Sequence, residues 1–201
     1  MSNGKKLVLA SWLLLCGWLT AQAQDSGPYI GAGIGGSQID VKEGPFFQSQ
    51  DDWVGSWSLT AGYRLNSWFA VEAGYTDLGT ATLRSDMSQP NVFDVSTKLK
   101  VDGYTAAAVA FLPLSSAFDL HGRVGVLLWD SDAKIRFPDA GFRQTTSSSG
   151  DDLFYGIGLG WHATENWSLS LDYQRYQDVG GDPLLGERDI DSVGIHAFYK
   201  F

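Results

Sequence analysis

The sequence predicts an all-β fold, an eight-stranded antiparallel up-and-down transmembrane β-barrel, and three observations support it. Apolar residues alternate with small or polar residues in eight segments of about ten residues, the period-two pattern of strands. Short turns and long polar connections alternate between these segments. The apolar positions are bulky and the opposite positions are mostly Gly, Ala and Ser, which suits a lipid-facing exterior and a narrow lumen. A ten-residue strand tilted by about 40° spans ~25 Å, the height of the apolar band of such barrels.

Residues 1–23 have the organisation of a secretory signal peptide. Two lysines precede an apolar run of 13 residues, Leu7 to Leu19, and a small-x-small cleavage site ends at Ala23. As a helix the run would reach only ~20 Å, too short for a ~30 Å hydrocarbon core. Lipoprotein processing at Cys16 is less favoured, because a bulky leucine precedes that cysteine. We therefore expect cleavage after Ala23 and a mature domain of residues 24–201.

Eight segments of the mature chain are predicted as strands by their apolar positions. The fourth segment, roughly 101–114, is Ala-rich, so its pattern does not distinguish its two faces. In the other seven, taken in order, the outward residues are Ile30, Ala32 and Ile34; Trp57, Leu59, Ala61, Tyr63 and Leu65; Phe69, Val71, Ala73 and Tyr75; Phe118, Leu120, Val124, Val126 and Leu128; Leu153, Tyr155, Ile157, Leu159 and Trp161; Trp167, Leu169, Leu171 and Tyr173; and Val193, Ile195, Ala197, Tyr199 and Phe201.

The connections predict which end of the barrel faces which side. Tight turns are expected at Asn66-Ser67, Ser115-Ser116 and Glu165-Asn166, and long loops at about 39–52, 79–98, 131–150 and 178–189. Within the last part of the third loop, Thr145 to Gly150 is predicted to be a low-complexity tip. Outer-membrane barrels have short periplasmic turns and long extracellular loops, so both termini are expected on the periplasmic side.

A soluble β-sandwich or lipocalin-like barrel would show the same period, but the aromatic residues favour a membrane. They gather at strand ends, as interfacial girdles do. The terminal Phe201, with Tyr199 two positions before it, resembles the signal by which outer-membrane proteins are recognised by their assembly machinery. The girdle residues are Trp68, Trp161, Trp167, Tyr199 and Phe201 at the turn end, and Trp53 and Trp57 near the loop end.

Four blocks of the chain follow one another in a characteristic order: Tyr29-Ile30-Gly31-Ala32-Gly33, Val71-Glu72-Ala73-Gly74-Tyr75 with Leu78-Gly79, Gly122-Arg123-Val124-Gly125 with Trp129, and Leu171-Asp172-Tyr173-Gln174. Together they resemble the transmembrane barrel domain of OmpA-type outer-membrane proteins. This resemblance implies a place in the bacterial outer membrane and contact with its lipid and lipopolysaccharide. Many family members continue into a periplasmic peptidoglycan-binding domain, whereas this sequence stops after the eighth segment, so cell-wall tethering is not expected.

Several charged residues fall on the small-residue side of the strands. On the lipid side each would cost roughly 2–4 kcal/mol near the midplane, so we expect them in the lumen. An eight-stranded lumen is only wide enough for side chains, which predicts that Glu72 and Asp172 pair with Arg123 and that His196 is a further partner. A satisfied polar plug is favoured over a gate on a small pore, because known family members carry further lumenal charges where Val109, Gly160 and Ser170 stand here. The predicted lumenal network is Arg64, Glu72, Arg123, Asp172 and His196, with Lys200 nearby.

Other classes of function are disfavoured. A formal charge of −9 repels phosphate backbones, which argues against nucleic-acid binding. Residues 31–36 match G-x-G-x-x-G, but no helical pattern follows, so the glycines are expected to keep the lumen clear rather than bind a dinucleotide. Acids in the expected loops, among them Asp77, Asp189 and Asp191, show no EF-hand spacing and are assigned to solubility. We therefore expect no cofactor and no metal site.

Lipid A-modifying enzymes also occur on eight-stranded barrels, and they need His, Ser and a carboxylate near the outer leaflet. His121 and His162 are expected beside the short turns, and Ser131 lies about ten residues from His121, ~33 Å along a strand. No triad is therefore predicted and no catalytic residue is assigned. The sequence favours a monomeric structural or surface-display barrel; the alternative is a narrow pore for ions or small solutes, and a lipid A-modifying enzyme is less favoured.

Overall fold

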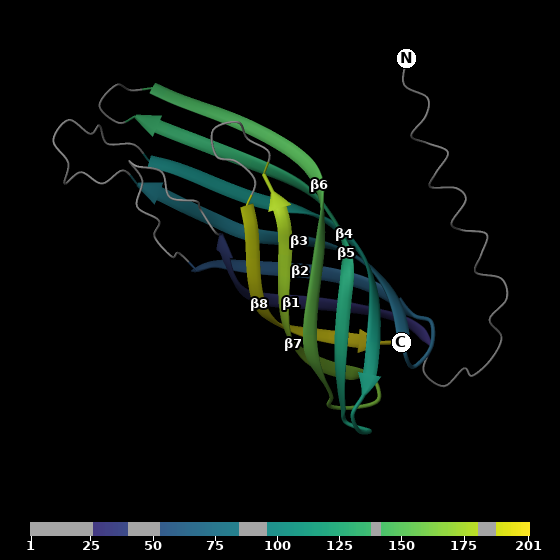
Figure 1. Cartoon of the computed structure of the whole chain (residues 1–201). Coiled ribbons are helices and arrows are strands. Elements are labelled where there is room, and N and C mark those ends of the chain that lie inside the picture. The colour runs from purple at the N-terminus through teal and green to yellow at the C-terminus, as the bar shows by residue number, and fades with distance from the viewer. Residues whose placement is uncertain (1–25, 40–52, 85–95, 138–141, 181–187) are drawn as a thin grey trace, which may run out of the picture.

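The computed structural model describes residues 26–39, 53–84, 96–137, 142–180 and 188–201. They form one closed sheet in which each strand pairs with its neighbours in sequence and the last strand pairs with the first, all antiparallel. The predicted fold class is confirmed (Figure 1). The strands are β1 (Gly27–Ile39), β2 (Trp53–Arg64), β3 (Phe69–Arg84), β4 (Ser96–Pro113), β5 (Phe118–Phe137), β6 (Phe142–His162), β7 (Trp167–Val179) and β8 (Arg188–Lys200). No helix formed by the described residues is long and apolar enough to cross a membrane.

The strands β3 to β6 are longer than predicted at the loop end. The prediction of a loop at 131–150 is wrong for most of that range. β5 continues to Phe137, β6 begins at Phe142, and these two residues are paired. Residues Thr145 to Gly150, predicted as a loop tip, lie within β6. The alternation of bulky and small residues marks only the part of a strand that crosses lipid, whereas ladder pairing continues beyond it with polar residues. Figure 1 shows these four strands projecting past the others. The predicted signal peptide and parts of all four long loops lie outside the described residues.

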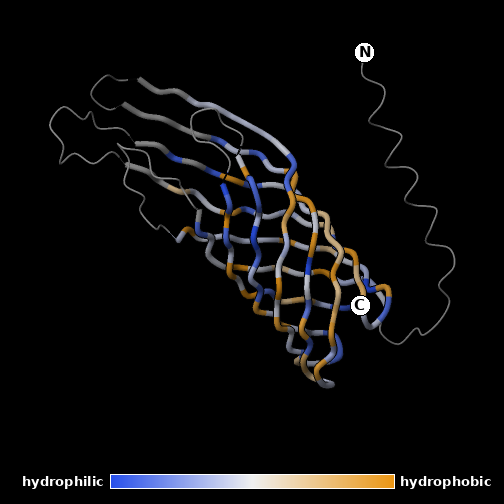
Figure 2. Tube along the Cα trace, viewed as in Figure 1, coloured by the Kyte–Doolittle hydropathy of each residue, from blue (hydrophilic) through white to orange (hydrophobic). Residues whose placement is uncertain are grey.

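Bulky apolar side chains point outward along the strands at the end near the short turns, as predicted. They include Ile34, Leu59, Val124, Ile157 and Leu171, all exposed. On the Ala-rich β4 the outward positions are the even-numbered ones from Tyr104, while Val109 is buried in the lumen. Figure 2 shows hydrophobic residues concentrated in this half of the barrel, whereas the projecting strand ends are more polar.

The three tight turns are built in the same way. In each, a polar side chain at the start of the turn accepts hydrogen bonds from the backbone N–H groups two and three residues later, as turn-forming Asn, Ser and Thr commonly do. The acceptors are Asn66 Oδ1 (2.8 and 2.9 Å), Ser115 Oγ (3.2 and 3.1 Å) and Thr164 Oγ1 (3.3 and 3.0 Å).

Aromatic rings form contacts at both edges of the apolar band. At the turn end the Tyr199 ring packs against Trp167 and Phe201, with centroids 5.1 and 5.2 Å apart. At the other edge the Tyr75 ring packs against Trp57 and against Tyr104, at 5.5 and 5.4 Å. These two groups lie where the amphipathic rings of interfacial girdles are found.

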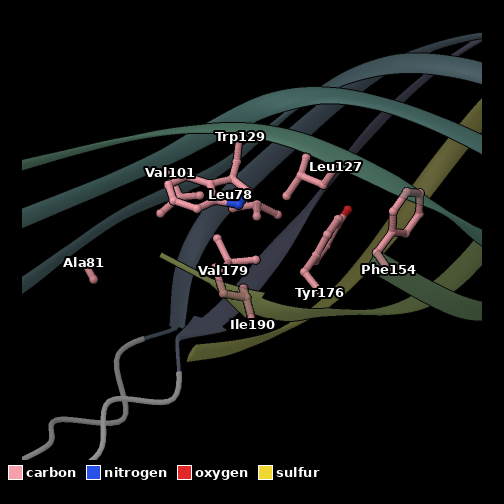
Figure 3. Packing of buried hydrophobic residues seen from close by; sticks show 9 residues of the cluster. All are labelled: Leu78, Ala81, Val101, Leu127, Trp129, Phe154, Tyr176, Val179 and Ile190. Atoms are coloured by element: carbon pink, nitrogen blue, oxygen red, sulfur yellow. The ribbon is translucent and has the colours of Figure 1, made fainter. Parts of the chain in front are cut away.

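The loop-side half of the lumen is filled by large apolar side chains, which corrects the expectation of a bore lined mostly by small residues. The outward alternation ends at Leu128, which is 54% exposed, while Leu127 and Trp129 beside it are 0% and 4% exposed and point inward. We call the following cluster the apolar plug (Figure 3): Leu78, Ala81, Val101, Leu127, Trp129, Phe154, Tyr176, Val179 and Ile190.

Two β-bulges help to place the apolar plug. The register of β3 against β4 shifts between Asp77 and Thr80, and that of β7 against β8 shifts between Tyr176 and Val179. Gly79, at the first shift, has φ +94°, a conformation that glycine adopts without strain. At each bulge the inward-facing positions change from even-numbered to odd-numbered residues. Leu78 and Ala81 on β3 therefore both face the lumen. The sequence pattern alone did not reveal this change of phase.

A charge placed on the lipid face should strongly destabilise the barrel. Val124 is exposed in the middle of the apolar stretch of β5. We expect Val124→Arg to lower the free energy of unfolding by ~2–4 kcal/mol, the cost of an arginine near the bilayer midplane. Urea unfolding in lipid vesicles measures this loss. Ser149→Arg is the matched control, because Ser149 is exposed on the projecting part of β6; equal losses in the two variants would contradict the assigned position of the membrane.

Candidate functional site

Charged and polar side chains meet in the turn-side half of the lumen. They occupy alternate, inward positions on four strands, so the period of two brings neighbours such as Asp119, His121 and Arg123 to the same face of β5. Inward glycines on the opposite strand leave room for them. A Cβ at Gly158 would overlap His121 Nε2 and Asp172 Oδ1, and one at Gly33 would overlap the ring of His196.

Arg123 joins the two carboxylates for which the sequence predicted it as a partner. Its Nε lies 2.8 Å from Glu72 Oε2, and its Nη1 lies 3.3 Å from Asp172 Oδ1. All three side chains are buried. Tyr29 Oη donates to Glu72 Oε1 at 2.7 Å. A buried guanidinium between two carboxylates closes the lumen at this level, and we call Arg123, Glu72 and Asp172 the ion layer.

The histidines extend this arrangement in both directions. His121 hydrogen-bonds Asp119 through Nδ1 at 3.2 Å and Asp172 through Nε2 at 2.7 Å. His162 Nε2 lies 2.7 Å from Asp119 Oδ2, and His196 Nδ1 lies 2.9 Å from Asp172 Oδ2, both ion-pair contacts rather than aligned hydrogen bonds. The structure therefore brings His196 to Asp172, as the sequence analysis anticipated.

Sequence reasoning left Asp119, His121, His162 and Ser170 out of the network. The Ser170 hydroxyl donates to Asp172, and both side chains are buried. Asp119 and His121 share the inward parity of Arg123, but the sequence analysis placed His121 beside a short turn and considered it only as a candidate for a catalytic triad. A residue two positions closer to the turn than an inward-facing residue also faces the lumen.

Arg64 faces the lumen, but it hydrogen-bonds its own turn and does not pair with the acids of the ion layer. Its guanidinium donates to the backbone oxygens of Asn66 (3.4 Å) and Ser67 (3.1 Å) and lies 4.1 Å from the centroid of the Phe111 ring. The reason is its height, because Gly62, not Arg64, pairs with Glu72 across the two strands. Arg64 therefore stabilises the turn end instead.

A serine, a histidine and a carboxylate are in a row that the sequence analysis did not foresee. His196 Nε2 lies 3.2 Å from Ser58 Oγ, and Asp172 lies on the other side of the ring. The order matches that of a hydrolytic triad, which also needs hydrogen-bond donors for an oxyanion. Gly33 and Ser58 are paired within the sheet, so their backbone groups belong to the ladder and do not form an oxyanion site. In addition, Asp172 is shared with Arg123 and His121. The row lies inside the lumen, whereas lipid A would lie outside the barrel in the outer leaflet.

Two cavities flank the ion layer. The turn-side cavity is lined by Asp119, His121 and His162 among others, and the inner cavity by Ser58, Asp172 and His196 among others. Glu72 and Arg123 line both, so they separate the cavities. The apolar plug begins beyond the inner cavity, whose lining includes the plug residues Phe154 and Tyr176. Among the described residues, no group of three or more His, Cys, Asp or Glu side chains is arranged to hold a metal ion.

Two clusters of ion pairs lie on the outer surface just beyond the apolar band. Lys100 Nζ lies 2.8 Å from Asp102 Oδ1 and 3.3 Å from Asp77 Oδ2. The hydrogen bond to Asp102 raises the pKa of Lys100 above its ordinary value, so this amine stays charged. On the other side Arg175 contacts Asp189 at 2.6 Å and Asp191 at 3.6 Å. These acids were assigned to loops, but Asp77, Asp189 and Asp191 are strand residues with cationic partners.

Comparison with known proteins agrees with this architecture. The family model described as OmpA-like transmembrane domain matches residues 23–201. Outer membrane protein A of Yersinia pseudotuberculosis is 28% identical over 98% of this chain and 56% of its own length, and that of Serratia marcescens is 26% identical over the same shares. The chain thus spans about half the length of the curated relatives it matches.

Solved structures share the fold at low sequence identity. Neisserial surface protein A superposes with a TM-score of 0.63 at 18% identity, covering 88% of this chain and 98% of that one. Ail of Yersinia pestis, solved with the heparin analogue sucrose octasulfate, gives a TM-score of 0.55 at 19% identity, with 88% and 99% covered. The closed barrel, its lipid-facing exterior and the match along the whole predicted mature region place the chain in the bacterial outer membrane, as a member of the OmpA-like transmembrane domain family.

Proposed function

We propose that this barrel is a structural and surface-display protein, which holds extracellular segments at the cell surface and does not conduct solutes. The observation that carries the proposal is the double closure of the lumen. The ion layer of Glu72, Arg123 and Asp172 is buried, and the apolar plug fills the lumen on the loop side. A solute would have to break buried ion pairs and then pass a packed apolar cluster. An ion would lose its hydration shell there without gaining polar partners, which costs free energy.

The projecting strands support a role at the surface. Beyond the apolar band, β5 and β6 continue as a paired ribbon with exposed polar residues such as Asp130, Ser147 and Ser149. Ser147 donates a hydrogen bond to Asp132 at 2.6 Å across this ribbon. A rigid base of this kind would hold the segments at its tip away from the membrane, where they can contact other molecules.

A single-channel recording tests the proposal. The refolded protein, inserted in a planar bilayer, is expected to give no reproducible unitary conductance, because both closures remain in place. A difference in migration between the boiled and the unboiled sample on a detergent gel shows that the barrel was folded. A reproducible conductance would overturn the display proposal in favour of the narrow pore, for which the charged lining of the two cavities is the supporting observation.

Further proposals concern maturation and assembly. Residues 1–23 are removed on export and residues 24–201 form the mature, monomeric barrel. Its insertion uses the outer-membrane assembly machinery, with Tyr199 and Phe201 in the recognition signal, and its exterior contacts lipopolysaccharide. The outward-facing aromatic ring contact between Tyr199 and Phe201 is compatible with that role. No cofactor, metal or enzymatic reaction is assigned.

A further inference from the structure

Five lumenal side chains, all three histidines of the chain and two aspartates, form one alternating row. Along it, successive nitrogen–oxygen distances are 2.7 Å (His162 to Asp119), 3.2 Å (Asp119 to His121), 2.7 Å (His121 to Asp172) and 2.9 Å (Asp172 to His196). The row begins at His162, whose side chain is 33% exposed at the turn end, and its interior members are buried.

Each interior member uses different atoms toward its two neighbours. Asp119 faces His162 with Oδ2 and His121 with Oδ1. His121 faces Asp119 with Nδ1 and Asp172 with Nε2. Asp172 faces His121 with Oδ1 and His196 with Oδ2. A group that receives a proton on one atom can therefore release one from the other, which relayed transfer requires. The two central links, from Asp119 to His121 and from His121 to Asp172, are hydrogen bonds. The outer links to His162 and His196 are close contacts, which a rotation of the histidine ring has to align before a proton passes. Salt bridges made only for stability have no need of this continuity.

The row also connects the two cavities that the ion layer separates. His162, Asp119 and His121 line the turn-side cavity, whereas Asp172 and His196 line the inner cavity. The link from His121 to Asp172 runs beside Arg123, which donates to the same Asp172 oxygen at 3.3 Å. The row thus crosses the level at which water and ions are blocked.

We propose that this row is a proton-transfer path between the turn-side cavity, on the periplasmic side, and the inner cavity. Histidine is the side chain suited to this task, because it exchanges protons near neutral pH through two distinct nitrogens. In the relay the two aspartates act as neutral carboxyl groups. Asp119 accepts the Nε2 proton of His162 on Oδ2 and gives its Oδ1 proton to His121 Nδ1. Asp172 accepts the Nε2 proton of His121 on Oδ1 and gives its Oδ2 proton to His196 Nδ1, so each group releases one proton when it accepts one. His196 delivers the last proton through Nε2 to the Ser58 hydroxyl or the inner cavity. One proton enters and one leaves, and no bond between heavy atoms changes.

The charged and polar groups around the row allow a proton to pass while the ion pairs of the ion layer stay intact. Glu72 on β3 is held by Arg123 and Tyr29, so it is engaged outside the row. Ser170 on β7 donates to Asp172 and fixes that carboxylate. Gly158 on β6 provides the space for the central link, since a Cβ there would overlap both His121 and Asp172. The row itself is carried by β5, β6, β7 and β8, and its polar neighbours Ser58, Glu72, Arg123 and Ser170 by β2, β3, β5 and β7.

Histidine-selective nitrogen NMR on the refolded, ¹⁵N-histidine-labelled protein tests the path. The measured quantity is the rate at which the His196 ring exchanges its proton, because His196 lies at the inner end of the row. His121→Gln keeps a polar side chain but cannot accept a proton on one atom and release it from another. We expect exchange at His196 to slow by roughly 10²-fold or more, the size of effect usual for a positioned proton-transfer group.

Two further variants make the result decisive. His162→Gln, at the exposed mouth, is expected to slow exchange at His196 although it lies two aspartates and a histidine away, and it serves if His121→Gln does not fold. Ser168→Ala alters the lining of the turn-side cavity outside the row and is expected to leave the rate unchanged. Unchanged exchange at His196 in a folded His121→Gln or His162→Gln protein would overturn the proposal. The outcome is independent of the conductance measurement, since proton transfer along side chains requires no open pore.

Discussion

Replacing Arg123 by alanine is expected to cost about 3–5 kcal/mol of stability, the usual effect of removing one partner from a buried ion pair. Arg123 is the cation that contacts both Glu72 and Asp172, and all three side chains are buried. The variant leaves Glu72 with Tyr29 as its remaining hydrogen-bond donor and weakens the compensation of Asp172. Urea unfolding of the refolded barrel in lipid vesicles measures the loss as a shift in midpoint with unchanged slope.

The control for this prediction is an arginine whose ion pairs are solvated. Arg175→Ala removes contacts to Asp189 and Asp191 on the outer surface, where water replaces the lost partner, so little change in midpoint is expected. Double substitution of Arg123 and Glu72 should lose less than the sum of the single substitutions, because the residues contact each other. An unchanged midpoint in Arg123→Ala would refute the pairing that defines the ion layer.

Truncating Phe154 should have an effect of similar size for a different reason. Its side chain is 1% exposed in the apolar plug, and its ring stacks on Tyr176 at a centroid distance of 5.2 Å (Figure 3). Phe154→Ala loses buried apolar contacts and leaves a cavity, which together cost about 3–5 kcal/mol in packed interiors. The same unfolding measurement in lipid vesicles reports the loss.

Tyr155 provides a matched comparison for Phe154. It is the next residue of β6, but it points to the opposite face and is 45% exposed. Tyr155→Ala exchanges lipid contacts for other lipid contacts and should therefore destabilise the barrel much less. A loss as large as that of Phe154→Ala would mean that the two faces of β6 had been assigned wrongly.

The sequence predicted the part of the fold that one physical rule governs. Where a strand crosses lipid, bulk must face outward and small or polar residues inward, so the outward positions of Leu59, Val124 and Tyr155 follow from alternation alone. Beyond the lipid the rule no longer applies. Residues 145–150 were therefore taken as a loop, and the inward Leu127 and Trp129 were not recognised as a packed cluster.

The lumenal site was predictable in composition and less so in its connections. Parity places Glu72, Arg123 and Asp172 on inward faces, and their opposite charges suggest that they pair. The height of each residue in the barrel depends on strand stagger, which the sequence does not reveal. This explains why Arg64 bonds to its own turn, whereas His121, expected beside a short turn, reaches Asp172 on another strand.

The outward ion clusters of Lys100 and Arg175 have a consequence for how deeply the protein is seated. They border the apolar band on opposite sides of the barrel, next to Tyr104 on β4 and Tyr173 on β7. A thicker bilayer would have to submerge these charges or thin around them, and either adjustment costs free energy for each ångström of mismatch. The clusters therefore set how deeply the barrel lies in the bilayer. They favour membranes whose hydrocarbon thickness matches the height of the apolar band.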